Sequence, residues 1–172
     1  VSEIVIHPKA NKDVEEYVSK ELYDMKKEVE SGQKKFDALA RLYSDDPAVK
    51  DNGGQYSLNK NDKNWDPAFF AAAFKLKDGQ ISPVIKSKFG LHIIQMVSRA
   101  GDDAVIRHIL KIPPITDVEI KATISRLDSV KAKINDGTIT FSEGVSLYSD
   151  DDNSKLIGGY IAAPDGSTYL TI

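Results

Sequence analysis

The stretch Leu42-Tyr43-Ser44-Asp45-Asp46 organises this sequence, because it recurs residue for residue 105 positions later as Leu147-Tyr148-Ser149-Asp150-Asp151. Sliding the chain against itself by 105 positions gives 14 identities over the 54 positions between Val1 and Gly54, without a gap. The other identities lie mainly at turn and apolar positions and include Ile4/Ile109, Pro8/Pro113, Leu22/Leu127, Gly32/Gly137, Phe36/Phe141, Lys50/Lys155 and Gly53-Gly54/Gly158-Gly159. A fixed period indicates a repeated structural unit. We therefore expect one complete domain over residues 1–100 and an incomplete second copy over residues 101–172.

Working outward from this stretch, the first copy opens with a strand signal and two helix signals. Residues 1–6 are short, apolar and β-branched, and Pro8 closes the run. Apolar residues at helical spacing then predict helices over residues 13–31 and 36–43. Residues 44–63 are polar and rich in turn residues, so an irregular loop is expected there.

The rest of the first copy predicts a short helix and a pair of strands. Asp66 followed by Pro67 is a helix-start signal, and the helix is expected to run to Phe74. Strands are expected over residues 81–86 and 91–97, with a tight turn at Phe89-Gly90 between them and a linker over residues 99–104. The order β-α-α-loop-α-β-β predicts an α+β domain with a small antiparallel sheet. The second copy repeats its opening, with a strand over 106–112, a helix over 120–134 and a shorter helix over 141–148.

Composition excludes several classes of function. The net charge is −3 and the basic residues form no stripe, which argues against a nucleic-acid partner. No apolar run is long enough to insert into a membrane, and residues 1–20 lack a signal-peptide core. The chain begins without Met, directly in a strand-like run, so we expect a mature or trimmed piece. The absence of Cys excludes disulfides, thiolate nucleophiles and Cys-type zinc sites.

Several spaced motifs, taken together, resemble the parvulin family of peptidyl-prolyl isomerases. They are Tyr43-Ser44-Asp45-Asp46-Pro47, Gly53-Gly54, Phe69-Phe70-Ala71-Ala72-Ala73-Phe74, Gly79-Gln80-Ile81-Ser82-Pro83-Val84 and Phe89-Gly90-Leu91-His92-Ile93-Ile94. The resemblance covers the whole first copy, and Arg107-His108-Ile109-Leu110 is similar to the opening strand of the family. Two such domains in tandem resemble the SurA-like folding factors of the bacterial periplasm; a cytosolic or membrane-anchored foldase is the alternative.

The resemblance implies a role for particular residues. Phe69, with Trp65 near it, would hold the proline ring of a substrate, although many family members have Met where Trp65 stands. His92 matches the inner histidine of the family, Ser87 a hydroxyl residue of the histidine network, and Asp46 the acidic position beside the twisting amide. Ser44 would help to hold the loop that carries Asp46. No cofactor and no metal are implied.

One departure from the family pattern concerns the other histidine. The family has it on the opening strand, where the first copy has Glu3 and the second copy has His108. The resemblance therefore implies that His108 and Asp151 belong to the pocket of the second copy, and that the first copy lacks half of its histidine pair. Glu3 itself is interpreted as a solvated strand residue.

Each of these residues also has a purely structural interpretation. Without the resemblance, His92 would be a hydrogen-bonded core histidine, and Phe69 a core aromatic residue. Asp46 could make turn hydrogen bonds before Pro47, which is the role we expect for Asp45. The acidic run at Asp150 does not fit a calcium loop, because the sixth and twelfth places would be Lys155 and Ile161.

Two functional hypotheses follow. In the first, the intact protein is a periplasmic isomerase and chaperone that binds unfolded, proline-containing polypeptides and assists the folding of exported or outer-membrane proteins. In the second, the domains only hold such clients, and Glu3 marks a first domain without catalysis. Unpaired strand edges in the incomplete second copy would also permit self-association.

Overall fold

The computed structural model describes residues 1–161, which form two compact units. One unit is the continuous segment Lys12–Pro114, and the other combines Val1–Asn11 with the chain from Ile115 onward. The sequence predicted a boundary at residue 100 instead. The difference arises because residues 103–111 form a strand in the sheet of the first unit, while residues 1–11 pack with the second.

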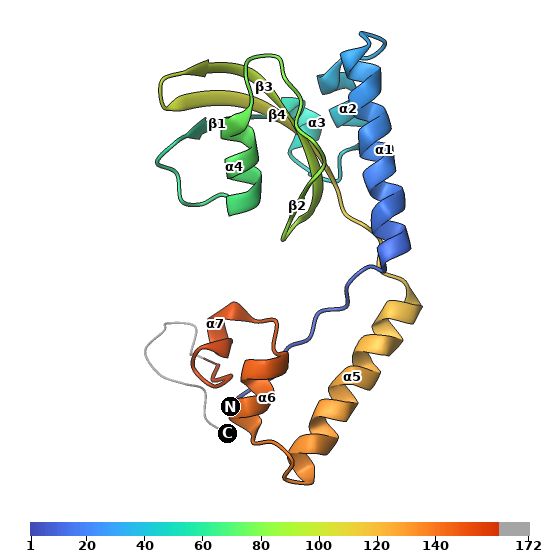
Figure 1. Cartoon of the computed structure of the whole chain (residues 1–172), viewed down its shortest axis with the longest axis vertical. Helices are drawn as coiled ribbons and strands as arrows, with labels where there is room; N and C mark the ends of the chain where they lie inside the picture. Colours follow the sequence, from blue (N-terminus) through green and yellow to red (C-terminus); the bar gives the residue numbers. More distant parts are fainter. Residues whose placement is uncertain (162–172) are drawn as a thin grey trace. The chain divides into compact units, whose positions relative to one another are not determined.

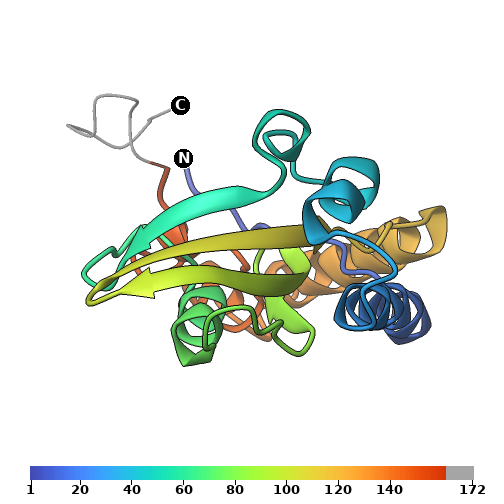
Figure 2. The same cartoon turned by 90° about the horizontal axis from the view of Figure 1, so that it is seen from above.

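The segment Lys12–Pro114 is an α+β domain built on a four-stranded antiparallel sheet in the order β1-β4-β3-β2. Figure 2 shows β1, β4 and β3 running side by side. The elements, in chain order, are α1 (Lys12–Glu30), α2 (Phe36–Tyr43), α3 (Val49–Asn52), β1 (Gln55–Asn59), α4 (Pro67–Lys75), β2 (Ile85–Ser87), β3 (Gly90–Ala100) and β4 (Asp103–Lys111).

Both faces of this sheet are covered, and successive residues of β3 belong to different cores. Ile93 packs with residues of α1 and α2, whereas Ile94 packs with residues of α4 and β1. Figure 1 shows α1 and α4 on opposite sides of the strands. Because side chains alternate along a strand, His92 and Ile94 share the face that α4 covers. On β4, His108 shares that same face with Ile106.

The predicted helices form close to their expected bounds. α1 carries the apolar stripe that includes the buried Val18 and Leu22. α4 starts as its cap signal predicts: the Asp66 side chain accepts hydrogen bonds from the backbone N–H groups of Ala68 and Phe69, and Pro67 occupies the first turn.

Three local predictions were wrong. Residues 1–6 form no continuous strand; Ser2 makes an isolated bridge with Tyr160. Residues 44–63 are not wholly irregular, because they contain α3 and the strand β1, which pairs with β4. Residues 99–104 are not a linker, because β3 and β4 are joined by the short turn at Gly101-Asp102. A smaller difference is that β2 is confined to Ile85–Ser87.

The second unit contains α5 (Asp117–Asn135), α6 (Phe141–Tyr148) and α7 (Asp152–Lys155). Both longer helices begin with a capping box, made by Thr116 and Glu119 in α5 and by Thr140 and Glu143 in α6. Val130 and Val145 are buried, whereas Ile120, Ile124 and Leu127 of the α5 stripe are exposed. The end of the predicted second copy, residues 162–172, lies outside the described part of the chain.

Candidate active site

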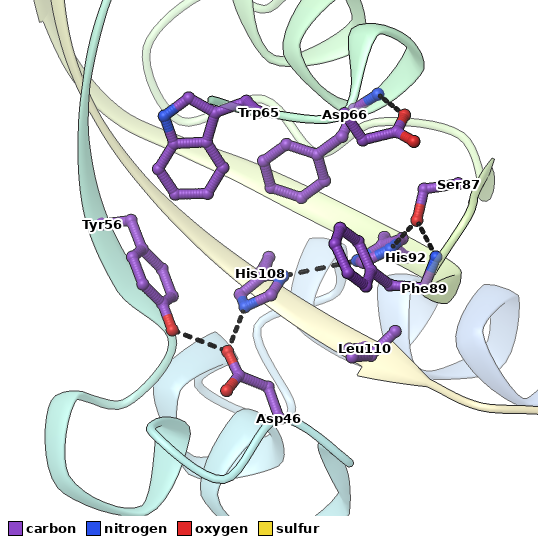
Figure 3. Close-up of a pocket in the computed structure, with 10 residues that line it drawn as sticks. Asp46, Tyr56, Trp65, Asp66, Ser87, Phe89, His92, His108 and Leu110 are labelled. Carbon is purple, nitrogen blue, oxygen red and sulfur yellow. Dashed lines mark hydrogen bonds and ion pairs between the residues drawn. The ribbon is translucent and has the colours of Figure 1, made fainter. Parts of the chain in front are cut away.

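An open cavity of about 230 Å³ lies on the α4 face of the Lys12–Pro114 domain (Figure 3). Its walls come from the loop after α2, from β1, from the start of α4, from the β2–β3 turn and from the middle strands. The lining residues are Asp46, Tyr56, Trp65, Asp66, Phe69, Ser87, Phe89, His92, His108 and Leu110.

Aromatic rings form the upper wall of this cavity. Trp65 and Phe69 stack, with ring centroids 5.7 Å apart and an interplanar angle of 13°. Phe69 in turn meets both histidine rings edge-on, at 5.1 Å from His92 and 5.5 Å from His108. Phe69 lines the cavity although it is only 3% exposed, and it also anchors α4 in the core.

A continuous chain of polar contacts runs along the floor (Figure 3). The Tyr56 hydroxyl donates to Asp46 Oδ2 at 2.7 Å, and His108 Nε2 lies 2.8 Å from the same oxygen. The two histidines face each other at 3.4 Å between their Nδ1 atoms. His92 Nε2 is 2.7 Å from Ser87 Oγ, which also accepts the backbone N–H of Phe89.

One arrangement of protons satisfies every contact in this chain. An ionised Asp46 can only accept, so His108 donates from Nε2 and, when neutral, accepts at Nδ1. His92 then donates a hydrogen bond from Nδ1 to Nδ1 of His108. Its Nε2 atom accepts a hydrogen bond from the Ser87 hydroxyl. The network is therefore fully satisfied when both imidazoles are neutral and Asp46 is charged.

The electrostatics favour the same protonation states. Burial, together with the positive charge that His108 would carry, lowers the pKa of His92 to about 4. Burial also lowers the pKa of His108, although its hydrogen bond to Asp46 opposes the shift. Burial alone would raise the pKa of Asp46, but the hydrogen bonds from Tyr56 and His108 outweigh it, so that this pKa lies below its usual value.

The structure brings together six of the eight residues that the resemblance singled out. Asp46, Trp65, Phe69, Ser87, His92 and His108 all line the cavity. Ser44 lies behind Asp46, where its hydroxyl accepts the backbone N–H groups of Asp46 and Leu110. The loop carrying Asp46 is thereby tied to β4.

Two expectations about the second copy need correction. His108 was assigned with Asp151 to a pocket of the second copy, yet its Nε2 atom contacts Asp46 of the first. The reason is the short turn that continues β3 into β4 and so places His108 beside His92. Asp151 does not line the cavity; it caps α7 in the other unit, accepting from the backbone N–H groups of Asn153 and Ser154.

Sequence reasoning missed four lining residues. Tyr56 was placed in an irregular loop, although it reaches Asp46 from β1. Asp66 was read only as a helix cap, yet it lines the cavity as well, and its second oxygen accepts the backbone N–H of Lys88. Phe89 and Leu110 carried no signal beyond the motifs that contain them. Within residues 1–161, no group of three or more His, Cys, Asp or Glu side chains is arranged to hold a metal.

Comparison with known proteins identifies the family. The model described as "Rotamase: PPIC-type PPIASE domain" matches residues 4–98, more than half of the chain. The chain therefore belongs to the PPIC-type, or parvulin, family of peptidyl-prolyl isomerase domains. This assignment agrees with the α+β fold and with the family resemblance found in the sequence.

Two curated relatives and one solved structure illustrate the similarity. Foldase protein PrsA 2 of Listeria monocytogenes serotype 4b is 51% identical over 74 residues, which are 41% of this chain and 25% of that protein. Chaperone SurA of Pectobacterium atrosepticum is 41% identical over 76 residues, 44% of this chain and 17% of that protein. A crystal structure of the peptidylprolyl isomerase PrsA from Bacillus cereus is similar with a TM-score of 0.42 and 23% identity, over 80% of this chain and 50% of that one.

The matched region is thus a minor part of both curated relatives. Among the helices of residues 1–161, none combines the length and the apolar character that crossing a membrane requires.

Proposed function

We propose that the cavity binds Xaa-Pro segments of unfolded polypeptides and accelerates their cis–trans isomerisation. The observation that carries this proposal is the convergence of Asp46, Phe69, His92 and His108 on one cavity of suitable size for a proline ring. Rotation about the peptide bond meets a barrier of about 18–20 kcal/mol, because the amide resonance must be broken. No covalent step is needed.

The chemistry of the lining suits such a rotation. Trp65 and Phe69 would hold the proline ring and exclude water from the amide. A planar amide carries partial negative charge on its oxygen, and this charge decreases as the bond twists and resonance is lost. The fixed negative charge of Asp46 would destabilise the planar amide more than the twisted one, provided that the carbonyl oxygen lies near it.

The histidine pair would fix the position of that carboxylate. Two neutral imidazoles, linked to each other and to Ser87, hold Asp46 through His108 while adding no charge of their own. Tyr56 holds the same oxygen from the other side. A preorganised charge of this kind needs no rearrangement during the reaction.

The hypothesis of a first domain that only binds clients rested on Glu3. His108, and not Glu3, faces His92 in the cavity, so that reason for expecting a missing histidine does not apply. We further propose that the clients are exported or outer-membrane polypeptides, that the protein acts in the periplasm or otherwise outside the cytoplasm as a SurA-like chaperone, and that the second repeat contributes to client holding or self-association. The support is the similarity to a chaperone and to foldases.

The proposal is tested with the whole chain and a proline-containing peptide whose isomerisation rate is followed by NMR exchange spectroscopy. Uncatalysed isomerisation takes tens of seconds, so catalysis is readily resolved. Replacing Trp65 by Ala removes the exposed part of the proline-binding wall, and we expect kcat/KM to fall by about tenfold, which corresponds to about 1.4 kcal/mol of lost binding to the transition state.

The matched control is Tyr17→Ala, because Tyr17 is an exposed aromatic residue of α1 that does not line the cavity. This variant should retain the activity of the unaltered chain. A chain that isomerises the peptide no faster than buffer does would refute the proposed function. Equal activity in both variants would show that the proline binds elsewhere.

A further inference from the structure

The two repeats bind each other's opening segments through the same backbone hydrogen bonds. His108 N donates to Gly54 O at 2.9 Å, and Glu3 N donates to Gly159 O at 2.8 Å. Glu3 and His108 are equivalent in the repeat, as are Gly54 and Gly159, since both pairs are 105 positions apart. The same interaction is therefore made twice, with the repeats interchanged.

Three further pairs of hydrogen bonds follow the same rule. Asp45 N donates to Leu110 O at 2.8 Å and Asp150 N to Val5 O at 2.6 Å. Leu110 N donates to Ser44 Oγ at 3.1 Å, and Val5 N to Ser149 Oγ at 3.2 Å. Ile112 N donates to Asp45 Oδ2 at 2.7 Å and His7 N to Asp150 Oδ2 at 3.1 Å. The groove of each repeat thus holds the opening segment of the other.

The shape of the two grooves is also the same. A Cβ atom added to Gly54 would lie only 2.4 Å from the carbonyl oxygen of His108. A Cβ atom added to Gly159 would lie only 2.5 Å from the carbonyl oxygen of Glu3. Both glycines have a positive φ, 80° and 81°. Because the held segment contributes only backbone atoms to these hydrogen bonds, they do not by themselves select β4 over Val1–His7 for the groove beside Gly54.

Both segments are joined to the Lys12–Pro114 domain by short tethers. β4 follows β3 after the two residues Gly101 and Asp102, and Val1–His7 is joined to α1 by only four residues, 8–11. The family match spans residues 4–98, so it includes the end of Val1–His7 and excludes β4. The chain order of the family therefore places Val1–His7, and not β4, as the opening strand of the first repeat.

From these observations we propose that Val1–His7 and β4 are alternative occupants of the groove beside Gly54, and that Val1–His7 is an inhibitory occupant because it brings Glu3 instead of His108 into the cavity. The effect on activity rests on the proposed isomerase function; the competition between the two segments does not. The structure describes the state with β4 in place, in which Glu3 is exposed.

The side chains at the interchanged position decide which state prevails. His108 is 6% exposed and lies 2.8 Å from Asp46 Oδ2. In the other state Glu3 would put a second carboxylate in that buried place, next to Asp46, and like charges there are costly. His92 would also lose the imidazole that its Nδ1 atom faces. The state with Val1–His7 bound is therefore a minor state without a complete site.

Engineered disulfides can trap each state, since the natural chain has no Cys. Gln55 of β1 faces Arg107 of β4 in the register, and the repeat equivalent of Arg107 is Ser2. The variant Gln55→Cys/Arg107→Cys should trap β4, and Gln55→Cys/Ser2→Cys should trap Val1–His7. Facing residues of antiparallel strands have Cα atoms at a distance that a disulfide spans.

Both variants of residues 1–172 are oxidised at high dilution, and the monomers are analysed by mass spectrometry and by the proline-peptide assay. We expect the β4 disulfide to form completely with full activity. The Val1–His7 disulfide should form more slowly, and the trapped monomer should lose at least tenfold in activity, which reduction restores. The competition is refuted if the Val1–His7 variant stays reduced, if it links only between two chains, or if the β4 variant fails to oxidise.

The replacement Glu3→His distinguishes an inhibitory side chain from a merely misplaced strand. Added to Gln55→Cys/Ser2→Cys, it should increase the yield of trapped monomer several-fold and return activity to that monomer. A trapped monomer with Glu3 that is as active as the unaltered chain would overturn the inhibitory role. If the unaltered chain has no isomerase activity, the disulfide yields still decide the competition, so the failure of the proposed function can be told apart.

Discussion

At the scale of single residues, Asp46 connects the two sides of the cavity. Its Oδ2 atom accepts hydrogen bonds from Tyr56 of β1 and His108 of β4, while its Oδ1 atom accepts one from the backbone N–H of Ala48. Three donors leave the carboxylate little freedom to rotate. A charged group with so many fixed partners is positioned before any substrate arrives.

Replacing Asp46 by Asn should therefore impair the site more than its small change in shape suggests. The amide has no charge, and its oxygen and NH2 group cannot accept from all three donors. A hydrogen bond to a charged group contributes about 1.5–3 kcal/mol, so we expect kcat/KM to fall by roughly ten- to a hundredfold. The measurement is the peptide isomerisation rate of the whole chain.

The neighbouring Asp45 provides the matched control. Its side chain accepts the backbone N–H of Ile112 and does not line the cavity. Asp45→Asn keeps an oxygen that can accept this hydrogen bond and, like Asp46→Asn, removes one negative charge, but outside the cavity. Activity should therefore change by less than about twofold, or roughly 0.4 kcal/mol. Similar losses in the two variants would mean that general charge, and not the position of Asp46, matters.

At the scale of elements, the close approach of β4 to the end of α3 decides whether the cavity is complete. Gly54 precedes β1 and lies against the backbone of His108. Gly54→Ala should thus displace β4 in addition to straining a backbone with a φ of 80°. Gly79→Ala is the matched control, because Gly79 has the same φ and open space around its Cα.

We expect Gly79→Ala to destabilise the domain by about 1–2 kcal/mol, the usual cost of a side chain in the left-handed region. Gly54→Ala should cost about 1–3 kcal/mol more, because the added methyl group overlaps the neighbouring strand. Urea unfolding of the two variants measures the difference. Equal destabilisation would contradict the described position of β4.

Elements with local signals could be predicted from the sequence, and those that depend on distant partners could not. Asp66-Pro67 predicted the start of α4, since a cap acts within a few residues. β1 has the polar sequence Gln55-Tyr56-Ser57-Leu58-Asn59 and forms by pairing with β4, nearly fifty residues away. The sequence also could not show whether residues 1–6 or residues 106–111 form the strand beside β3, because both segments have the pattern of a strand.

The site shows the same division. Asp46, Phe69, Ser87 and His92 could be named from motifs that lie within the first repeat. His108 was named but assigned to the wrong repeat, and Tyr56 was missed. Both depend on the pairing of β4 with its neighbours, which no local pattern records.

At the scale of the whole molecule, the stability of the Lys12–Pro114 domain should depend on pH through its histidines. The pKa of His92 is about 4 in the folded chain and 6.5 in an ordinary environment. Between these values the unfolded chain binds a proton that the folded chain does not. The free energy of unfolding is therefore highest above pH 6.5 and falls as the pH drops toward 4.

This loss should amount to about 3 kcal/mol for His92, since one pKa unit corresponds to 1.36 kcal/mol. His108 adds to it in the same direction. Trp65, the single Trp of the chain, lies in this domain, so its fluorescence follows the unfolding of this unit. The measurement is urea unfolding at several values of pH.

The variant His92→Gln should lose most of the pH dependence between 6.5 and 4, although it is less stable at neutral pH. A stability that stays constant from pH 7 to pH 5 in the unaltered chain would contradict the buried, neutral state of the pair.

The short turn at Gly101-Asp102 also has a consequence for biosynthesis. A ribosome releases the chain from its N-terminus, and folding can begin before synthesis ends. Residues 12–100 emerge before His108, so a nascent chain stopped near residue 100 has the groove but not its second imidazole, whereas Val1–His7 is already outside. Once the turn emerges, β4 can fold back onto β3 within microseconds. Translation would thus present the two competing segments one after the other, with the histidine-bearing segment last.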